Sequence, residues 1–125
     1  MTSGPTAAML AAVRGEPFHI GFSGVAQYDL AADVARAAVT AAHSEARAAR
    51  VYNVPGAPAD VADVVMCIRS LIPDAEVTWS GDPLPFPPLL ESVGFDREVG
   101  PFPRTSLPDG VAATIEHFRR TLATG

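Results

Sequence analysis

The sequence contains no lysine, because all nine of its basic residues are arginine. A tyrosine–lysine pair for proton transfer therefore cannot form within these 125 residues. A glycine-rich dinucleotide loop is missing as well: the ten glycines are scattered, and Gly21-Phe-Ser-Gly24 has the wrong spacing for one. The sequence thus carries neither that catalytic pair nor a cradle for a pyrophosphate.

Cysteine is almost absent too. The single Cys67 lies in an apolar run, so the sequence offers no disulfide framework and no thiolate metal site, and we expect a buried, inert thiol. The three histidines, at positions 19, 43 and 117, lie too far apart for a metal-binding spacing. We therefore expect no metal site.

The chain has no basic cluster and no long apolar run near its N-terminus. A net charge of −5 argues against nucleic acid or an anionic membrane as a partner and favours small molecules or protein. Arg14 and Glu16 interrupt the first apolar stretch, so a signal peptide and a transmembrane span are not expected. A cytoplasmic location is the resulting expectation.

The composition that is present, with 48% apolar and 18% charged residues, is typical of one globular domain. Helical periodicity predicts about four helices, over residues 5–14, 31–47, 61–72 and 107–123. In the second, Val34, Ala38 and Ala42 form one stripe, which predicts a well-packed helix.

Between the helices, β-branched and aromatic residues predict short strands near residues 18–22, 26–30, 50–54 and 76–80. Four of the six residues in 83–88 are proline, which excludes a central strand there, and residues 94–103 are expected to be irregular. The predicted fold class is α/β, with helices and short strands in alternation.

Several polar residues fit either a structural or a chemical role. Asp60 and Asp63 form a pair of carboxylates, but their place in the first turn of a helix favours capping. Asp33, at another helix start, fits either a first-turn carboxylate or a residue that contacts substrate. Ser3 and Ser23 have no base nearby in the sequence, which argues against a serine nucleophile.

Four segments in a fixed order carry a resemblance to a known family. They are Asp33-Val-Ala-Arg-Ala, Val51-Tyr-Asn-Val-Pro-Gly, Leu84-Pro-Phe-Pro, and Arg104-Thr-Ser-Leu-Pro-Asp-Gly-Val before the last helix. Together they resemble the C-terminal half of NAD-dependent epimerase/dehydratases, the extended short-chain dehydrogenase/reductase family. The resemblance covers nearly all of the chain. It implies a single substrate-binding lobe, residues 1–125, which lacks the N-terminal Rossmann half of that fold.

The resemblance also implies which residues contact substrate. The opening Thr2-Ser3-Gly4-Pro5-Thr6 is similar to the entry of the first helix of the substrate lobe. Asp33 matches the second acid of the family's Val-Asp-Asp-Val-Ala pattern, with Ala32 in place of the first. No catalytic, cofactor-binding or metal-binding residue is assigned, and the expected substrate-binding residues are Thr2, Ser3, Thr6, Tyr28 and Asp33. Tyr28 also fits a strand residue whose ring packs with its hydroxyl at the margin.

Two departures within the resemblance bear on the substrate. Ala26 stands where the nucleotide-sugar branch commonly carries an arginine that binds a diphosphate, and a methyl group cannot replace a guanidinium there. The Leu84-Pro-Phe-Pro segment resembles the branch that includes erythronate-type sugar-acid dehydrogenases. The resemblance therefore implies a small hydroxylated or sugar-acid substrate.

Two hypotheses remain open from the sequence. In the first, the chain is the substrate-binding part of an NAD(P)-dependent oxidoreductase or epimerase; it binds no cofactor alone and is inactive without a missing Rossmann half. In the second, it is a stand-alone small-molecule-binding or assembly module that pairs with a separate dinucleotide-binding chain. The predicted strand at residues 50–54 would lack sheet neighbours, so self-association is also expected.

Overall fold

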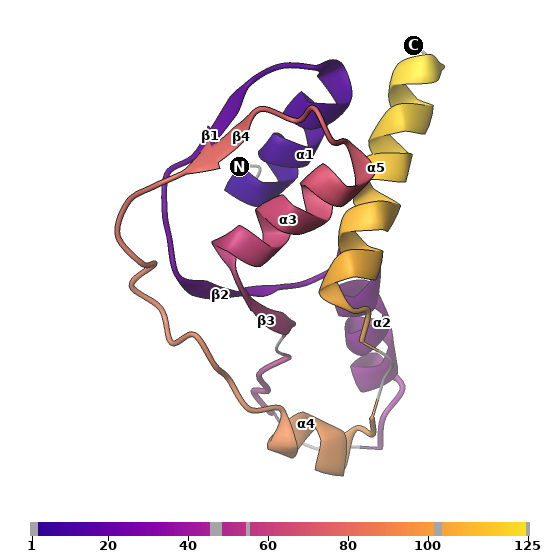
Figure 1. Cartoon of the computed structure of the whole chain (residues 1–125). Coiled ribbons are helices and arrows are strands. Elements are labelled where there is room, and N and C mark those ends of the chain that lie inside the picture. The colour runs from indigo at the N-terminus through magenta and orange to yellow at the C-terminus, as the bar shows by residue number, and fades with distance from the viewer. Residues whose placement is uncertain (1–2, 46–48, 55, 102–103, 125) are drawn as a thin grey trace.

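The computed structural model describes residues 3–45, 49–54, 56–101 and 104–124. Three helices form the body of the molecule: α1 (Gly4–Arg14), α3 (Val61–Leu71) and α5 (Leu107–Ala123). They lie side by side, each in contact with the other two, and α2 (Ala31–Ala42) and α4 (Val93–Glu98) lie at one end of this body (Figure 1).

Two small sheets complete the fold. In the first, β1 (Phe18–Ile20) pairs in parallel with β4 (Val77–Trp79), with Phe18 opposite Val77. In the second, β2 (Val25–Tyr28) pairs antiparallel with β3 (Ala57–Asp60), with Tyr28 opposite Ala57. The predicted strands near residues 18–22 and 76–80 are thus confirmed in shortened form, and the one near 26–30 is confirmed with earlier bounds.

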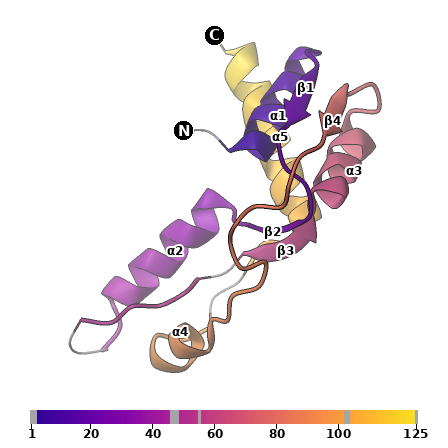
Figure 2. The same cartoon turned by 90° about the vertical axis from the view of Figure 1, so that its left-hand side faces the viewer.

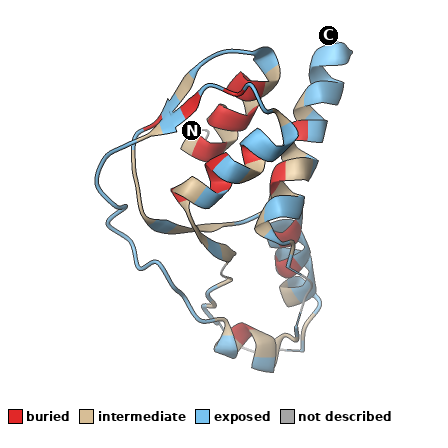
Figure 3. Cartoon of the chain, in the orientation of Figure 1, coloured by how far each residue is buried: buried red, intermediate tan, exposed pale blue. Residues whose placement is uncertain are grey.

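The main core lies where α1, α3 and α5 face one another and the β1–β4 pair (Figure 3). The apolar period predicted for α3 is confirmed over most of the helix, because Val61, Val64, Val65 and Ile68 are buried. The stripe ends at Leu71, which is 39% exposed. Burial of such side chains is the main stabilising term for helices of this length.

Side-chain caps begin each of the three body helices. Ser3 caps α1 and Ser106 caps α5, and both of these helices have a proline in the first turn. At α3, the Asp60 side chain accepts from the Ala62 amide over 2.9 Å, while the Asp63 carboxylate accepts from the Asp60 amide over 3.2 Å. This reciprocal arrangement is a capping box, and it confirms the capping role predicted for Asp60 and Asp63.

The predicted strand at residues 50–54 is wrong. The structure describes 49–54 with no strand, and β3 begins at Ala57 instead. An extended segment becomes a strand only when a neighbouring strand accepts and donates its hydrogen bonds. No such neighbour lies beside 49–54 in the described part of the chain, and Val51 is 96% exposed.

The tight entry into β3 depends on Gly56. A Cβ atom added there would lie 2.2 Å from the carbonyl oxygen of Tyr28 and 2.6 Å from the Asp29 Oδ1 atom. Both distances are far below van der Waals contact, so glycine alone fits between β2 and β3 at this point.

The helix predicted over residues 31–47 is shorter and less packed than expected. It ends at Ala42, and residues 46–48 lie outside the described part of the chain. The predicted stripe of Val34, Ala38 and Ala42 faces solvent, and the buried residues are Asp33 and Ala37. The expectation of a well-packed helix is therefore wrong, because α2 projects away from the body (Figure 2).

A fifth helix, α4, lies in a region predicted to be irregular. It is only six residues long, so its periodicity gives little signal in the sequence. Its Phe95 is buried against Ala37 of α2, and the Tyr52 ring meets the Phe95 ring edge-on with 5.7 Å between centroids. This second, smaller cluster fixes α4 and residues 49–54 to α2.

Candidate functional site

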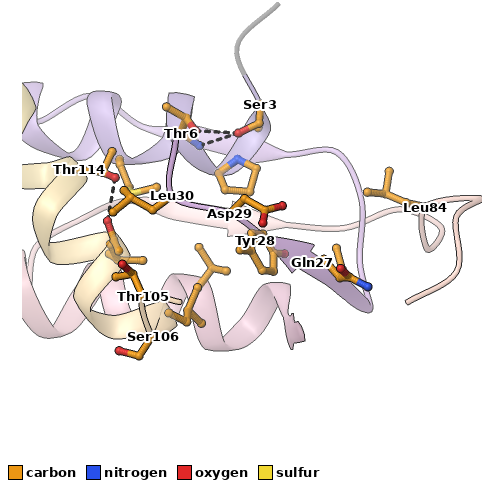
Figure 4. Close-up of a pocket in the computed structure, with 18 of the residues that line it drawn as sticks. Ser3, Thr6, Gln27, Tyr28, Asp29, Leu30, Leu84, Thr105, Ser106 and Thr114 are labelled. Atoms are coloured by element: carbon orange, nitrogen blue, oxygen red, sulfur yellow. Dashed lines mark hydrogen bonds between the residues drawn. The ribbon is translucent and has the colours of Figure 1, made fainter. Parts of the chain in front are cut away.

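The described residues enclose a cavity of about 620 Å³, within the range of small-molecule sites. It lies at the N-terminal ends of α1 and α5, beside β2 and the segment that follows β4 (Figure 4). Elements from distant parts of the sequence form it, and its lining residues are Ser3, Gly4, Pro5, Thr6, Met9, Phe22, Ala26, Gln27, Tyr28, Asp29, Leu30, Val64, Leu84, Phe86, Thr105, Ser106, Leu107, Gly110, Val111 and Thr114.

One side of the cavity carries hydroxyl groups from the two helix starts. At α1, the Ser3 and Thr6 hydroxyls are hydrogen-bonded over 2.7 Å. At α5, the Ser106 hydroxyl donates to the Asp109 carboxylate over 2.6 Å, and Thr114 donates to the carbonyl oxygen of Gly110 over 2.8 Å. A hydroxyl can both donate and accept, so these groups retain capacity for a ligand's hydroxyls.

Tyr28 lines the cavity, and its hydroxyl is the most distinctive polar group nearby. Its oxygen is buried and has no hydrogen-bond partner among the described residues. Burial raises the pKa of Tyr28 to about 12, and the nearby Asp60 and Asp63 carboxylates add to the rise. The group is therefore a neutral phenol at ordinary pH, and leaving it without a partner costs free energy.

Asp33 holds the rim of the cavity in place from outside it. Its carboxylate accepts the Thr105 backbone amide over 2.6 Å and the Thr105 hydroxyl over 3.1 Å, and it also pairs with Arg36. The Thr105 amide is the chief cause that lowers the pKa of Asp33 below its ordinary value. Thr105 lines the cavity, so Asp33 links α2 to the cavity wall across 72 positions of sequence.

The lining contains no arginine and no histidine among the residues described, and Asp29 is its one charged residue. Burial, and then the Asp33 carboxylate, raise the pKa of Asp29. The prolines in the first turns of α1 and α5 each remove a backbone donor that an anion would need. The cavity suits uncharged polar ligands better than phosphates.

The predicted substrate-binding residues divide into three groups. Ser3, Thr6 and Tyr28 line the cavity, Asp33 lies behind its rim, and Thr2 falls outside the described residues. Five polar lining residues were not expected from the sequence: Gln27, Asp29, Thr105, Ser106 and Thr114. Ser106 carries a readable signal as the cap before Leu107-Pro108-Asp109, but nothing in the sequence shows that two helix starts meet.

A serine–histidine arrangement also escaped the sequence analysis. The Ser80 hydroxyl lies 3.1 Å from His19 Nε2, and the Thr78 hydroxyl lies 2.9 Å from His19 Nδ1. These groups lie on the exposed face of the β1–β4 pair, outside the cavity, where water surrounds a nucleophile and no pocket positions a substrate. We assign them no chemistry.

Cys67 is only partly buried, so the expectation of a buried thiol is wrong in degree. Partial burial, with the Asp63 carboxylate nearby, raises the pKa of the thiol, which keeps it protonated and unreactive. Among the residues that the structure describes, no group of three or more potential ligands could hold a metal ion. No helix in the described ranges is long and apolar enough to cross a membrane.

No protein-family model matches the chain, and no curated protein matches it by sequence. Solved structures match it by fold. A partial-consensus L-threonine 3-dehydrogenase superposes with a TM-score of 0.84 at 17% identity, covering 93% of this chain and 41% of its own. The chain has the fold of the C-terminal part of an extended short-chain dehydrogenase.

Two other neighbours agree. UDP-glucuronic acid 4-epimerase from Bacillus cereus, solved in complex with NAD, has a TM-score of 0.73 at 15% identity, covering 94% of this chain and 39% of its own. The Bordetella bronchiseptica enzyme WbmF, solved with NADH, has a TM-score of 0.76 at 22% identity. The match covers 98% of this chain and 38% of WbmF. The chain thus spans about two fifths of the length of each, and identities this low establish the fold alone.

The Asp33–Thr105 link generates a testable prediction about stability. We expect Asp33→Asn to lower the unfolding free energy by about 2 kcal/mol at pH 7, since hydrogen bonds to an ionised acceptor are among the stronger ones. The folded-state pKa of Asp33 is lowered, so its contribution is present above the ordinary value and is lost as pH falls through the folded value. Urea denaturation at pH 7 and pH 3 measures both effects.

The matched control is Asp74→Asn, because Asp74 is exposed. This variant should stay within about 0.5 kcal/mol of the parent at both pH values. Equal losses from the two variants, or a loss at Asp33 that does not shrink at pH 3, would contradict the role assigned to Asp33.

Proposed function

We propose that this chain is the substrate-binding part of an NAD(P)-dependent oxidoreductase or epimerase that acts on a small hydroxylated substrate. One observation carries the proposal: the cavity at the starts of α1 and α5 carries a row of hydroxyls, and its lining includes Tyr28, whose buried hydroxyl has no hydrogen-bond partner among the described residues. The fold shared with a dehydrogenase and an epimerase supports the reaction class.

The charge of the cavity supports an uncharged substrate. A carboxylate or diphosphate taken out of water needs a cation or several aligned donors, and the described lining supplies no arginine or histidine. Hydroxyl groups on a ligand need only donors and acceptors, which Ser3, Thr6, Ser106 and Tyr28 supply. The Tyr28 phenol has no partner among the described residues, and it would gain one where the ring turns its buried hydroxyl toward a bound ligand.

A sugar acid of the erythronate type is the second candidate. The positive ends of the α1 and α5 helix dipoles both lie at the cavity, and such ends attract a carboxylate. The prolines in the first turns reduce the number of free donors at these ends, which makes this candidate the weaker one. The two candidates differ in one charge and can be separated by binding.

The chain by itself is proposed to be catalytically inactive and to bind no NAD or NADP. Its 125 residues contain no lysine for the tyrosine–lysine pair and no glycine-rich loop before a helix, so they do not fit a dinucleotide. When bound, the cofactor supplies hydride transfer. This chain's residues would bind and orient the substrate and exclude water from it.

A stand-alone module that pairs with a separate dinucleotide-binding chain is the alternative. Exposed apolar residues support it: Val51 is 96% exposed, and Val34 and Val39 of α2 also face solvent. Such surfaces mark contacts with other polypeptides when they gather on one side. Self-association through the same surfaces is a third outcome, and light scattering of the purified chain distinguishes it.

Binding of a ligand series tests the charge preference. We expect methyl β-D-glucopyranoside and sorbitol to bind with dissociation constants of about 1–10 mM, and glucuronate and gluconate to bind at least about tenfold more weakly. Chemical-shift titration of the isotope-labelled chain measures all four. Tighter binding of the acids would favour the sugar-acid candidate, and no binding of any of the four would contradict the proposed function.

Tyr28→Phe tests the phenol within the same titration. We expect about fivefold weaker binding of the uncharged ligands. The unfolding free energy should be unchanged or higher, because the lost hydroxyl has no partner among the described residues. Tyr52→Phe is the control: its hydroxyl donates to Glu98 over 2.9 Å away from the cavity, so stability should fall and binding should not change. The reverse pattern would sink the role given to Tyr28.

Titration with the cofactors tests the inactivity of the isolated chain. We expect no dehydrogenase turnover, and no calorimetric signal with NAD, NADH, NADP or NADPH at a dissociation constant below about 10 μM. A tighter constant for any of them would show that these residues form a dinucleotide site unlike the glycine-rich one.

A further inference from the structure

The segment between β4 and α4, residues 83–91, forms one wall of the cavity and is exposed along its whole length. Four prolines between positions 83 and 88 restrict its backbone and remove donors. Figure 1 shows it as a long strap that passes outside the body before it reaches α4. We call residues 83–91 the proline strap.

The proline strap is anchored mainly at its ends. Ser23 lies opposite Pro83 in a bridge, and the Ser23 hydroxyl donates to the carbonyl oxygen of Gly81 over 2.7 Å. At the other end, the Ser92 hydroxyl accepts from the Arg104 guanidinium over 2.8 Å, just before α4 begins. Between the two ends, the Gln27 Nε2 donates to the Pro88 carbonyl oxygen over a long 3.4 Å. Gln27 also lines the cavity, so this contact ties the strap to the site.

Two apolar side chains of the strap line the cavity, Leu84 and Phe86. Phe86 is 68% exposed even though it lines the cavity, so the described residues leave most of its surface uncovered. A ligand in the cavity would cover apolar surface on that ring and remove it from water. The strap side of the cavity is therefore apolar, whereas the α1 and α5 side carries hydroxyls.

A cavity with one apolar side and one hydroxyl-bearing side favours a ligand that has one apolar face and hydroxyl groups elsewhere. A sugar in its ring form carries hydroxyls around its edge and C–H groups on its face, and the partly positive C–H groups are attracted to the negative face of an aromatic ring. An open-chain polyol or sugar acid presents hydroxyls on all sides and has no comparable apolar face. A cavity with one apolar side and one hydroxyl-bearing side therefore favours the ring form.

We propose that Phe86 is a specificity-determining residue of this cavity and that it stacks on the C–H face of an uncharged cyclic sugar whose hydroxyls meet the α1 and α5 side. This inference rests on the proposed function and narrows its substrate class from small hydroxylated compounds to cyclic sugars. In this arrangement the bound sugar covers the Phe86 ring, and the proline strap covers one face of the sugar.

Phe86→Ala and its matched control Leu89→Ala test the proposal. The two side chains share the strap and are equally exposed, at 68% and 67%, but Leu89 does not line the cavity. Neither change empties a core, so both variants should unfold at the parent temperature. The probes are methyl β-D-glucopyranoside, methyl β-D-galactopyranoside and methyl β-D-xylopyranoside as ring forms, with sorbitol as the open chain.

We expect Phe86→Ala to weaken binding of the best ring-form probe about fivefold and sorbitol by less than about twofold, and Phe86→Trp to restore the ring-form affinity. Leu89→Ala should leave every dissociation constant unchanged.

If probes bind the parent but Phe86→Ala has the same dissociation constants as Leu89→Ala, the stacking role is wrong and the proposed function stands. If sorbitol weakens as much as the ring forms, the selection of rings is wrong. If no probe binds the parent, both proposals fail together.

Discussion

The buried carboxylate of Asp33 is the interaction on which the arrangement of the site depends. It accepts the Thr105 amide over 2.6 Å and the Thr105 hydroxyl over 3.1 Å, so one side chain satisfies two donors from a segment 72 positions away. This places Thr105 and the start of α5 near the start of α1 and the C-terminal end of β2, where the cavity lies. Burying the Asp33 carboxylate without these donors would be strongly unfavourable, so the folded arrangement of α2 depends on the hydrogen bonds from Thr105.

The cavity that results has a consistent chemical character. Its hydroxyls come from residues that also cap helices, its apolar side comes from a proline-rich segment with few donors of its own, and no described lining residue is cationic. These properties favour ligands that are uncharged and polar on one side only. The fold is similar to part of two enzymes solved with NAD or NADH, and oxidation or epimerisation of such a ligand is the function that we propose.

Local patterns predicted much of the fold, and long-range contacts account for the failures. The helices α1, α3 and α5 follow from apolar spacing and from caps such as Asp60, because those signals act within a few residues. The strand predicted at residues 50–54 failed because a strand needs neighbours, which the described residues do not supply. The predicted burial of Val34, Ala38 and Ala42 was wrong, because the helical periodicity of apolar residues does not show which face of a helix another element covers.

The site was predictable only in part, for the same reason. Ser3, Thr6 and Tyr28 were expected from a resemblance and line the cavity, whereas Gln27 and Thr114 carry no signal in the sequence. The role of Asp33 as the anchor of Thr105 depends on two segments that meet only in the folded chain.

The most direct test of this account is the amide proton of Thr105, observed by nuclear magnetic resonance during an acid titration and in hydrogen exchange. A hydrogen bond to a buried carboxylate predicts a strongly downfield amide, exchange as slow as that of core amides, and a shift that changes only below the ordinary pKa of an aspartate. A Thr105 amide that exchanges as rapidly as those of exposed segments, with no titration of its shift, would contradict the account.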